Sequence, residues 1–321
     1  MRTVSKRIIT LHSSTNVKTS LKNNKKNKKE YIQSYLMILP QLIGFCVFTI
    51  YPIAWVVHLG WFSYDGVTKT YIGWENFIRL FTRDPMYWST LLNTFVLAIG
   101  KLIVELPLAL ILAVILNLKL KGRSFFRAMF YMPNVISSAI IGIIFYFMFA
   151  SFEGIVNNIL LALKFISEPI NWFGSKSTAM FVIAVAAIWQ GFGINMLFFL
   201  SALQNIPEEL YECADIDGAN KFRQFLHITV PMLAPVSKVI FMLAFIGSLK
   251  ITDLVLVLTN GQPAGQTEVV MTYIFKYFFT NSEGSSSQIG YASALGLVTS
   301  IIIGLVTVFY LKMMKKTGNI Y

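Results

Sequence analysis

Six long apolar runs dominate this chain of 321 residues and leave little sequence for a water-soluble core. A membrane-spanning helix needs about 20 mostly apolar residues, and each run reaches that length. The runs cover residues 35–62, 88–118, 125–150, 179–203, 233–258 and 291–311. A transmembrane β-barrel would instead alternate apolar and polar residues in segments of about ten. The pattern therefore predicts an all-α fold, a polytopic transmembrane helical bundle with six spans.

The distribution of charge predicts how the bundle is oriented. Only 13% of the residues are charged and 55% are hydrophobic, whereas soluble domains carry about 25% charged residues. With Arg127 at the start of the third run included, eighteen of the 27 Lys and Arg residues belong to the first, third, fifth and seventh segments outside the spans, and six fall in the segments between these. Positive residues favour the cytoplasmic side, so both termini are expected there. This asymmetry accounts for most of the net charge of +12 without nucleic acid.

Three segments are predicted along the chain. Residues 1–33 are polar and basic, and the apolar run that follows is too long for a secretory signal. We expect a cytoplasmic tail there, which either contacts anionic membrane lipid or simply orients the chain. Residues 34–316 form the span region, and residues 317–321 form a short C-terminal tail. The predicted outer loops are too short for a separate domain, so ligand capture outside is expected to need another protein.

The predicted cytoplasmic loop 204–232 carries features that a simple connection does not need. Pro207 followed by two glutamates predicts a helix start, because proline suits the first turn and acids favour the positive end of the helix dipole. Gly218 predicts the end of that helix in a left-handed turn. A second short amphipathic helix is expected to follow, with apolar residues at helical spacing: Phe222, Phe225, Leu226 and Ile228. Two such helices predict docking of a cytoplasmic partner in a groove.

The sequence E-C-A-D-I-D-G-A at residues 212–219, with its apolar continuation and Pro231, resembles the EAA loop of binding-protein-dependent ABC importer permeases. Cys213 replaces an alanine of the family pattern, which is a small-for-small change. The resemblance implies that this loop docks in an ATPase subunit. The residues that it assigns to ATPase coupling are Glu212, Ala214, Asp217, Gly218, Ala219, Phe222 and Phe225.

Further stretches resemble sugar permeases of the maltose-transporter type. They are residues 48–52, 73–77, 121–127, 258–263 and 290–295, with Gln262 in place of a family glycine. The resemblance implies a heterodimer with a second permease, two cytoplasmic ABC ATPase subunits and an external solute-binding protein, in a bacterial plasma membrane. The extra N-terminal spans and large external domain of the maltose-type protein are not present here, so the shorter six-span form is expected.

ATP is expected to be bound by the partner subunits. The chain has no G-x-x-x-x-G-K-[ST] pattern, and Gly174 to Ser177 lacks the leading glycine and falls in a predicted outer loop. The three histidines lie far apart in the sequence, which gives no metal cluster and no catalytic constellation. We therefore expect a transport subunit without a cofactor or metal of its own and without enzymatic activity.

Polar residues inside the spans are the candidates for the solute path, because such residues are costly in lipid and are functional by default. Alignment through the motifs adds that several lie at or near sugar-lining positions of the maltose-type permease. The candidates are Asn134, Ser138, Gln190, Gly191, Asn195, Ser248, Lys250 and Asp253. Each of these residues could instead serve only to form hydrogen bonds between neighbouring helices. The pairs Lys250–Asp253 and Lys101–Glu105 are spaced to neutralise each other, and we interpret the second pair as structural.

The predicted function is translocation of a di- or oligosaccharide in an ATP-driven importer. A permease of the same type for glycerol phosphate or another polar solute is an alternative, and an ion-coupled secondary transporter is another. The second alternative would favour internal repeats, and it does not need the acidic loop. A membrane-bound enzyme is disfavoured by the lack of paired catalytic residues near a membrane face.

Overall fold

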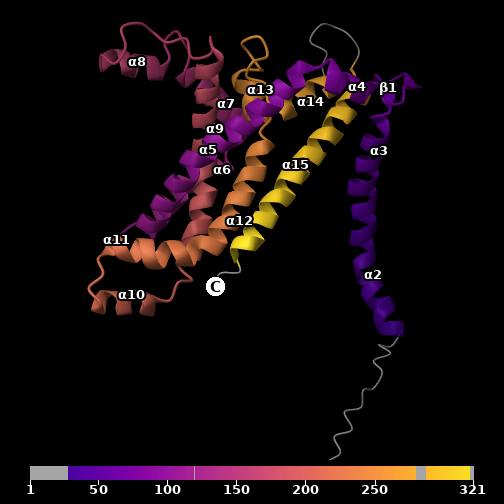
Figure 1. Ribbon diagram of the computed structural model, residues 1–321. Helices are drawn as coiled ribbons and strands as arrows, with labels where there is room; N and C mark the ends of the chain where they lie inside the picture. Colours follow the sequence, from indigo (N-terminus) through magenta and orange to yellow (C-terminus); the bar gives the residue numbers. More distant parts are fainter. Residues whose placement is uncertain (1–27, 119, 280–286, 319–321) are drawn as a thin grey trace, which may run out of the picture. The chain divides into compact units, whose positions relative to one another are not determined.

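The computed structural model describes residues 28–118, 120–279 and 287–318 as helices with one small hairpin (Figure 1). The helical elements are α2 (Lys28–Phe45), η1 (Cys46–Ile50), α3 (Tyr51–Leu59), α4 (Glu75–Thr82), α5 (Pro85–Asn117), α6 (Arg123–Val135), α7 (Ser138–Met148), α8 (Ile155–Ala162), α9 (Lys176–Leu203), α10 (Glu208–Ile216), α11 (Lys221–Gln224), η2 (Phe225–Thr229), α12 (Val230–Leu249), α13 (Asp253–Leu258), α14 (Val270–Phe279) and α15 (Ile289–Gly318). The predicted basic tail lies outside the described residues up to residue 27, and helix α2 already begins at Lys28. The last residues of the predicted C-terminal tail, 319–321, also lie outside them.

The chain divides into two compact units, residues 1–56 and 57–321. In the first unit, α2, the π-helical segment η1 and the start of α3 belong to an apolar helical run, Ser34–Leu59. Its side chains are exposed almost throughout, with Met37 and Phe48 both more than four-fifths accessible. An apolar helix with so little buried surface of its own suits a lipid environment better than water.

Within the described residues, five helical runs are long and apolar enough to cross a membrane, and a bent pair of helices is a sixth candidate. The five are Ser34–Leu59, Pro85–Asn117, Lys176–Leu203, Lys221–Leu249 and Ile289–Met314. Helices α6 and α7 meet at 95°, so the predicted run 125–150 is broken rather than straight. The predicted run 233–258 is wrong at its end, because α12 stops at Leu249 and α13 is a separate short helix.

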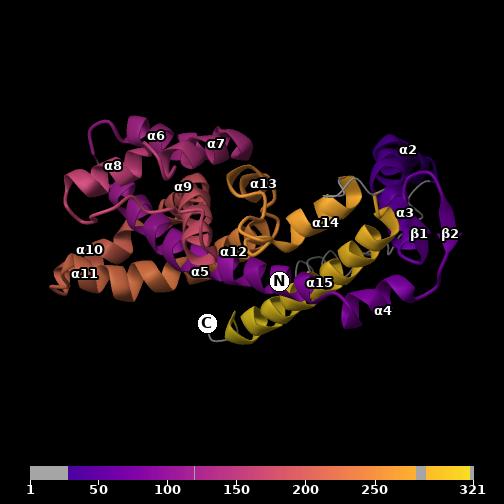
Figure 2. The ribbon, with the colours of Figure 1, turned by 90° about the horizontal axis from the view of Figure 1, so that it is seen from above.

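Helix α5 is the centre of the second unit and contributes to all three apolar clusters of its core. It packs along α9, where the fully buried Ala109 and Ala113 share a cluster with Met196. Small residues allow helix backbones to approach closely when lipid supplies no hydrophobic driving force. Seen from above, α9 lies against α5 with α6 and α7 on one flank (Figure 2). A side chain at Gly193 would collide with the Phe130 carbonyl of α6, so glycine permits this approach.

The start of α5 is fixed by the buried carboxylate of Asp84. It accepts the backbone N–H of Tyr87 at 3.0 Å and the hydroxyl groups of Tyr273 and Tyr291. These bonds tie α14 and α15 to α5. The neighbouring strands β1 (Phe62–Tyr64) and β2 (Lys69–Tyr71) form an antiparallel hairpin in which Phe62 pairs with Tyr71.

Within the second unit, the short helices lie at two opposite ends of the long ones. Figure 1 shows α10 and α11 at one end of α5 and α9, and α8 and α13 at the other. This arrangement agrees with the predicted alternation of inner and outer loops. It also leaves the segment 204–232 far from the connections that contain α8 and α13.

Candidate functional site

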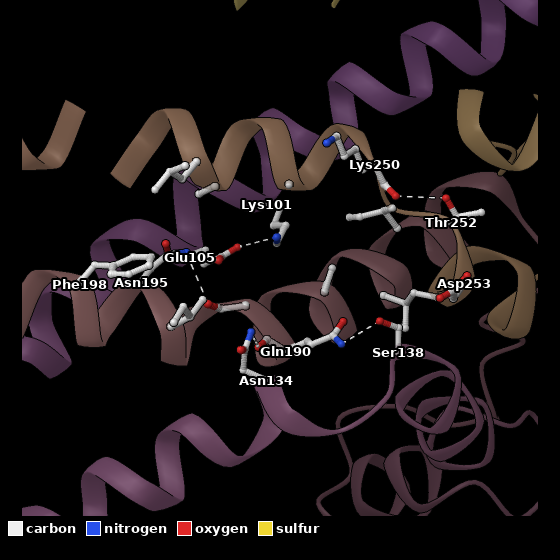
Figure 3. A pocket seen from close by; sticks show the side chains of 18 residues that line it. Lys101, Glu105, Asn134, Ser138, Gln190, Asn195, Phe198, Lys250, Thr252 and Asp253 are labelled. Carbon is white, nitrogen blue, oxygen red and sulfur yellow. Dashed lines mark hydrogen bonds and ion pairs between the residues drawn. The ribbon is translucent and has the colours of Figure 1, made fainter. Parts of the chain in front are cut away.

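A pocket of about 400 Å³ lies between α5, α7, α9, α12 and the segment that leads into α13 (Figure 3). Its polar lining consists of Lys101, Glu105, Asn134, Ser138, Gln190, Asn195, Lys250, Thr252 and Asp253. Apolar groups complete the wall, among them Ala187, Ile194, Phe198, Leu243 and Ile251. Ammonium, carboxylate, amide and hydroxyl groups therefore face one space, and Phe198 adds an aromatic side chain.

The break between α6 and α7 forms one side of the pocket. Ile136 is extended at the break and its carbonyl cannot continue a helix. Gln190 of α9 compensates for this, because its side-chain amide donates to the Ile136 carbonyl at 3.4 Å and to the Ser138 hydroxyl at 2.9 Å. Freed backbone groups at membrane depth need such partners. The broken span thus turns Asn134 and Ser138 toward the pocket.

A buried ion pair on α5 forms the opposite side. Lys101 Nζ lies 3.1 Å from Glu105 Oε2, and both side chains are nearly inaccessible. Asn195 of α9 donates to Glu105 Oε1 at 2.6 Å, and Lys101 donates to the Ser248 hydroxyl of α12 at 3.2 Å. Charges taken out of water are tolerated only when they are paired and hydrogen-bonded. This network joins three helices at the wall of the pocket.

Gly191 gives the ion pair the space that it occupies. A Cβ atom at this position would lie 2.5 Å from Glu105 Oε1 and 3.2 Å from Lys101 Nζ. The first distance is too short for a Cβ contact, so any side chain here would require the Glu105 carboxylate to move away from α9. Gly191 therefore lines the pocket, and its contact with the ion pair explains why this position is a glycine.

Seven of the eight predicted solute-path residues line this pocket together. The exception is Ser248, which is buried behind the wall and accepts the Lys101 hydrogen bond. Lys101 and Glu105, which we interpreted as a structural pair, are an ion pair and also line the pocket. The sequence did contain a sign of this second role, because two opposite charges four residues apart inside a span point to a functional site.

The two remaining charged residues of the pocket, Lys250 and Asp253, are not in direct ionic contact with each other. Both are exposed, and no ion pair joins them in the part of the chain that the structure describes. Lys250 ends α12 and Asp253 opens α13. In the same described part, no group of three or more His, Cys, Asp or Glu residues is placed to hold a metal ion.

The predicted helix–turn–helix loop is confirmed as local structure. Helix α10 begins at Glu208 after Pro207, and two glutamates occupy its first turn. Gly218 follows with a φ of +74°, a left-handed conformation that costs a side chain about 1–2 kcal/mol. Asn220 then caps α11 by accepting the backbone N–H of Arg223 at 2.9 Å.

One buried amide holds the two short helices together. Gln224 donates to the Asp215 carboxylate and, at 3.1 Å, to the Ala219 carbonyl. Lys221 Nζ also donates to Asp215 at 3.1 Å. The hydrogen bond from Lys221, followed by that from Gln224, lowers the pKa of Asp215 below its ordinary value. Sequence reasoning did not single out Gln224, since its neighbours give no local sign that it is buried.

The amphipathic helix predicted after Gly218 continues without interruption, through the π-helical segment η2, into α12. Its apolar residues divide between two faces. Ile228 packs against the core cluster at this end of α5 and α9, and Phe225 is half-buried. Phe222 is exposed, as is Ile216 of α10. The remaining residues assigned to ATPase coupling also differ in exposure: the exposed ones are Glu212, Asp217 and Gly218, and the half-buried ones are Ala214 and Ala219. The loop is thus attached directly to a long helix that lines the pocket.

Long apolar helices, a polar pocket at a broken span and an amphipathic loop at one end define a multi-pass helical membrane permease. The family described as "Binding-protein-dependent transport system inner membrane component" matches residues 105–316 of this chain. The chain therefore belongs to that family, as the EAA-like segment predicted. The matched region contains the loop and most of the pocket.

Three curated relatives cover most of the chain. The arabinooligosaccharides transport system permease protein AraP of Bacillus subtilis (strain 168) is 36% identical over 87% of both chains. The lactose transport system permease protein LacF of Rhizobium radiobacter is 36% identical over 77% of this chain and 84% of its own. The trehalose/maltose transport system permease protein MalF of Thermococcus litoralis is 33% identical over 91% and 98%.

A solved structure shares the fold at lower identity. It is the crystal structure of a bacterial alginate ABC transporter in complex with alginate pentasaccharide-bound periplasmic protein. One of its chains superposes with a TM-score of 0.79 at 23% sequence identity, covering 91% of this chain and 97% of that one. The likeness shows a common arrangement of helices.

Proposed function

We propose that this chain is the transmembrane permease subunit of an ATP-driven ABC importer for a di- or oligosaccharide. The observation that carries the proposal is the pocket, in which ammonium, carboxylate, amide and hydroxyl groups surround about 400 Å³. This volume falls in the range of about 300–1,000 Å³ of small-molecule sites. Its donors and acceptors match the hydroxyl groups of a carbohydrate, and the relatives named for arabinooligosaccharides, lactose and trehalose/maltose support this substrate class.

In this proposal, the permease region 34–316 has six spans with both termini in the cytoplasm of a bacterial-type cell, and α6 and α7 together form the third span. The chain pairs with a second permease in the plasma membrane and receives its solute from an external solute-binding protein. Two cytoplasmic ATPase subunits bind and hydrolyse ATP. The basic tail 1–33 lies on the cytoplasmic side, as does the segment 317–321.

The loop 204–232 is proposed to dock in an ATPase subunit. The exposed Phe222 and Ile216 provide apolar contacts, and the exposed Glu212 and Asp217 provide charge. Because α11, η2 and α12 form one continuous helical run from Lys221 to Leu249, a movement of the docked loop displaces the helix that carries Lys250. ATP-dependent closure of the ATPases then drives the bundle between two states, in which the pocket opens to one side or the other.

Reconstituted uptake tests the proposal. Proteoliposomes would contain this chain with its second permease and ATPases, and the solute-binding protein would be added outside. Uptake of labelled arabinotriose, lactose, trehalose and maltose would be measured with and without internal ATP. We expect uptake of at least one of them that needs ATP and survives the collapse of all ion gradients. Uptake that follows an ion gradient and ignores ATP would favour a secondary transporter, and failure of all four saccharides would remove the substrate class.

A further inference from the structure

The charged residues of the pocket cancel, and this balance bears on the kind of solute that the pocket accepts. Two lysines, Lys101 and Lys250, line the space together with two acidic residues, Glu105 and Asp253. No other Lys, Arg, Asp or Glu of the described residues is in the lining. The formal charge of the pocket wall is therefore zero, although four of its side chains are ionisable.

The two pairs of charges are built differently. Glu105 and Lys101 are in direct contact, nearly inaccessible to water and held from both sides by Asn195 and Ser248. Lys250 and Asp253 are exposed and unpaired with each other. A buried charge that loses its counter-charge is strongly felt nearby, because the surroundings screen it poorly. A change at the buried pair should thus affect a bound solute more than the same change at the exposed residues.

We propose that the Lys101–Glu105 pair determines charge specificity: it keeps the wall neutral, so that the pocket prefers uncharged saccharides over anionic ones such as uronic acid oligomers. The inference rests on the proposed transport of saccharides and adds the charge class of the solute. A solute that bears a carboxylate would lose part of its hydration on binding. It would not gain an ionic contact with Lys101 in return, because Glu105 already neutralises that ammonium group. An uncharged saccharide keeps its hydrogen bonds to the same groups.

Binding to the permease complex in nanodiscs, without the solute-binding protein, tests this specificity directly. The omission matters because the binding protein has a selectivity of its own. The probes are maltose, or whichever neutral saccharide gives the highest uptake, and digalacturonate. The measured quantity is the ratio of their dissociation constants. For the wild type we expect the neutral saccharide to bind about tenfold more tightly or better, a difference of about 1.4 kcal/mol.

Charge variants should move this ratio in a defined order. Glu105→Gln retains an acceptor for Asn195 but leaves the Lys101 charge uncompensated, so digalacturonate should gain about tenfold or more relative to the neutral probe. Asp253→Asn should shift the ratio in the same direction by a smaller factor. Lys250→Gln should shift it in the opposite direction. Lys176→Gln removes an exposed charge outside the pocket lining and should leave the ratio unchanged.

Each outcome bears on the inference. If wild type binds digalacturonate as tightly as the neutral saccharide, or if Glu105→Gln and Asp253→Asn leave the ratio unchanged, the inference is wrong while the proposed saccharide transport stands. Asp253 is exposed, so its variant tests the charge balance of the pocket wall even if Glu105→Gln fails to assemble. If neither probe binds and no saccharide is imported by the complete transporter, the proposed function itself fails and the inference fails with it.

Discussion

The pocket and the loop both contain a Lys–carboxylate pair at about 3.1 Å, yet the two pairs differ in almost every other respect. In the pocket, Lys101 and Glu105 are 10% and 1% exposed. In the loop, Lys221 and Asp215 are 80% and 53% exposed. Equal distances therefore do not mean equal energies, because water and salt screen the outer pair. The buried pair holds three helices in a fixed arrangement, whereas the exposed pair supports a local turn.

The largest effect is expected from breaking the buried pair. Glu105→Ala would leave the Lys101 ammonium buried without a counter-charge and Asn195 without its acceptor. We expect the free energy of unfolding to fall by about 3–5 kcal/mol, measured by thermal unfolding of the purified complex in detergent. The matched variant in the loop, Asp215→Ala, should change the unfolding temperature little. Equal losses from the two variants would refute the comparison.

A smaller loss is expected from crowding the same pair. Gly191→Ala would place a Cβ atom 2.5 Å from Glu105 Oε1, and overpacking of this kind costs about 1–3 kcal/mol. The control is Gly100→Ala on α5, where a Cβ atom would have no neighbour within 4 Å. We expect reduced uptake and a lower unfolding temperature only for the Gly191 variant. Wild-type behaviour of that variant would show that the pair can move aside without loss.

The turn at Gly218 should be sensitive to backbone strain rather than to burial. Gly218→Val must adopt a left-handed conformation at a cost of about 1–2 kcal/mol, whereas asparagine tolerates it better. We expect the valine variant to bind the ATPase subunits more weakly and to lose uptake, and Gly218→Asn to retain most of both. Pull-down of the ATPases and reconstituted uptake measure the two effects. If both variants behave like wild type, the turn has no part in coupling.

The smallest effect concerns pH. The folded-state pKa of Asp215 lies below its ordinary value of 3.8 because Lys221 and Gln224 donate to its carboxylate. The resulting stabilisation of the turn is complete above the ordinary value and is lost as the pH falls through the lower folded-state value. Hydrogen exchange of the peptide 208–224 should show this loss in wild type but not in Asp215→Asn. The same acid-induced loss in the variant would assign it to another group.

The sequence predicted the helical runs and the loop because both depend on local patterns. Hydropathy located the runs near their observed positions, and Pro207 and Gly218 marked the ends of α10. Hydropathy carries no information about direction, so the 95° break between α6 and α7 was not predicted. At that break, the side chain of Gln190, more than 50 residues away in the sequence, satisfies the freed carbonyl of Ile136.

The pocket was predicted in part for the same reason. Polar residues in spans pointed to seven residues that line it, since the cost of such residues in lipid is itself a local signal. What each side chain faces depends on packing between distant helices. Glu105 was therefore interpreted as a structural partner of Lys101 although both also face the pocket, and Ser248 was placed in the path although it lies behind the wall.

The most direct test of the account is chemical labelling of Cys213, an exposed thiol within the loop segment 212–219. A membrane-impermeant maleimide would be added to sealed right-side-out and inverted vesicles, in a Cys46→Ser background that removes the other free thiol. The account predicts labelling of Cys213 only in inverted vesicles stripped of the ATPase subunits, and protection when those subunits are added back. Labelling from the outside, or labelling that the ATPases leave unchanged, would contradict it.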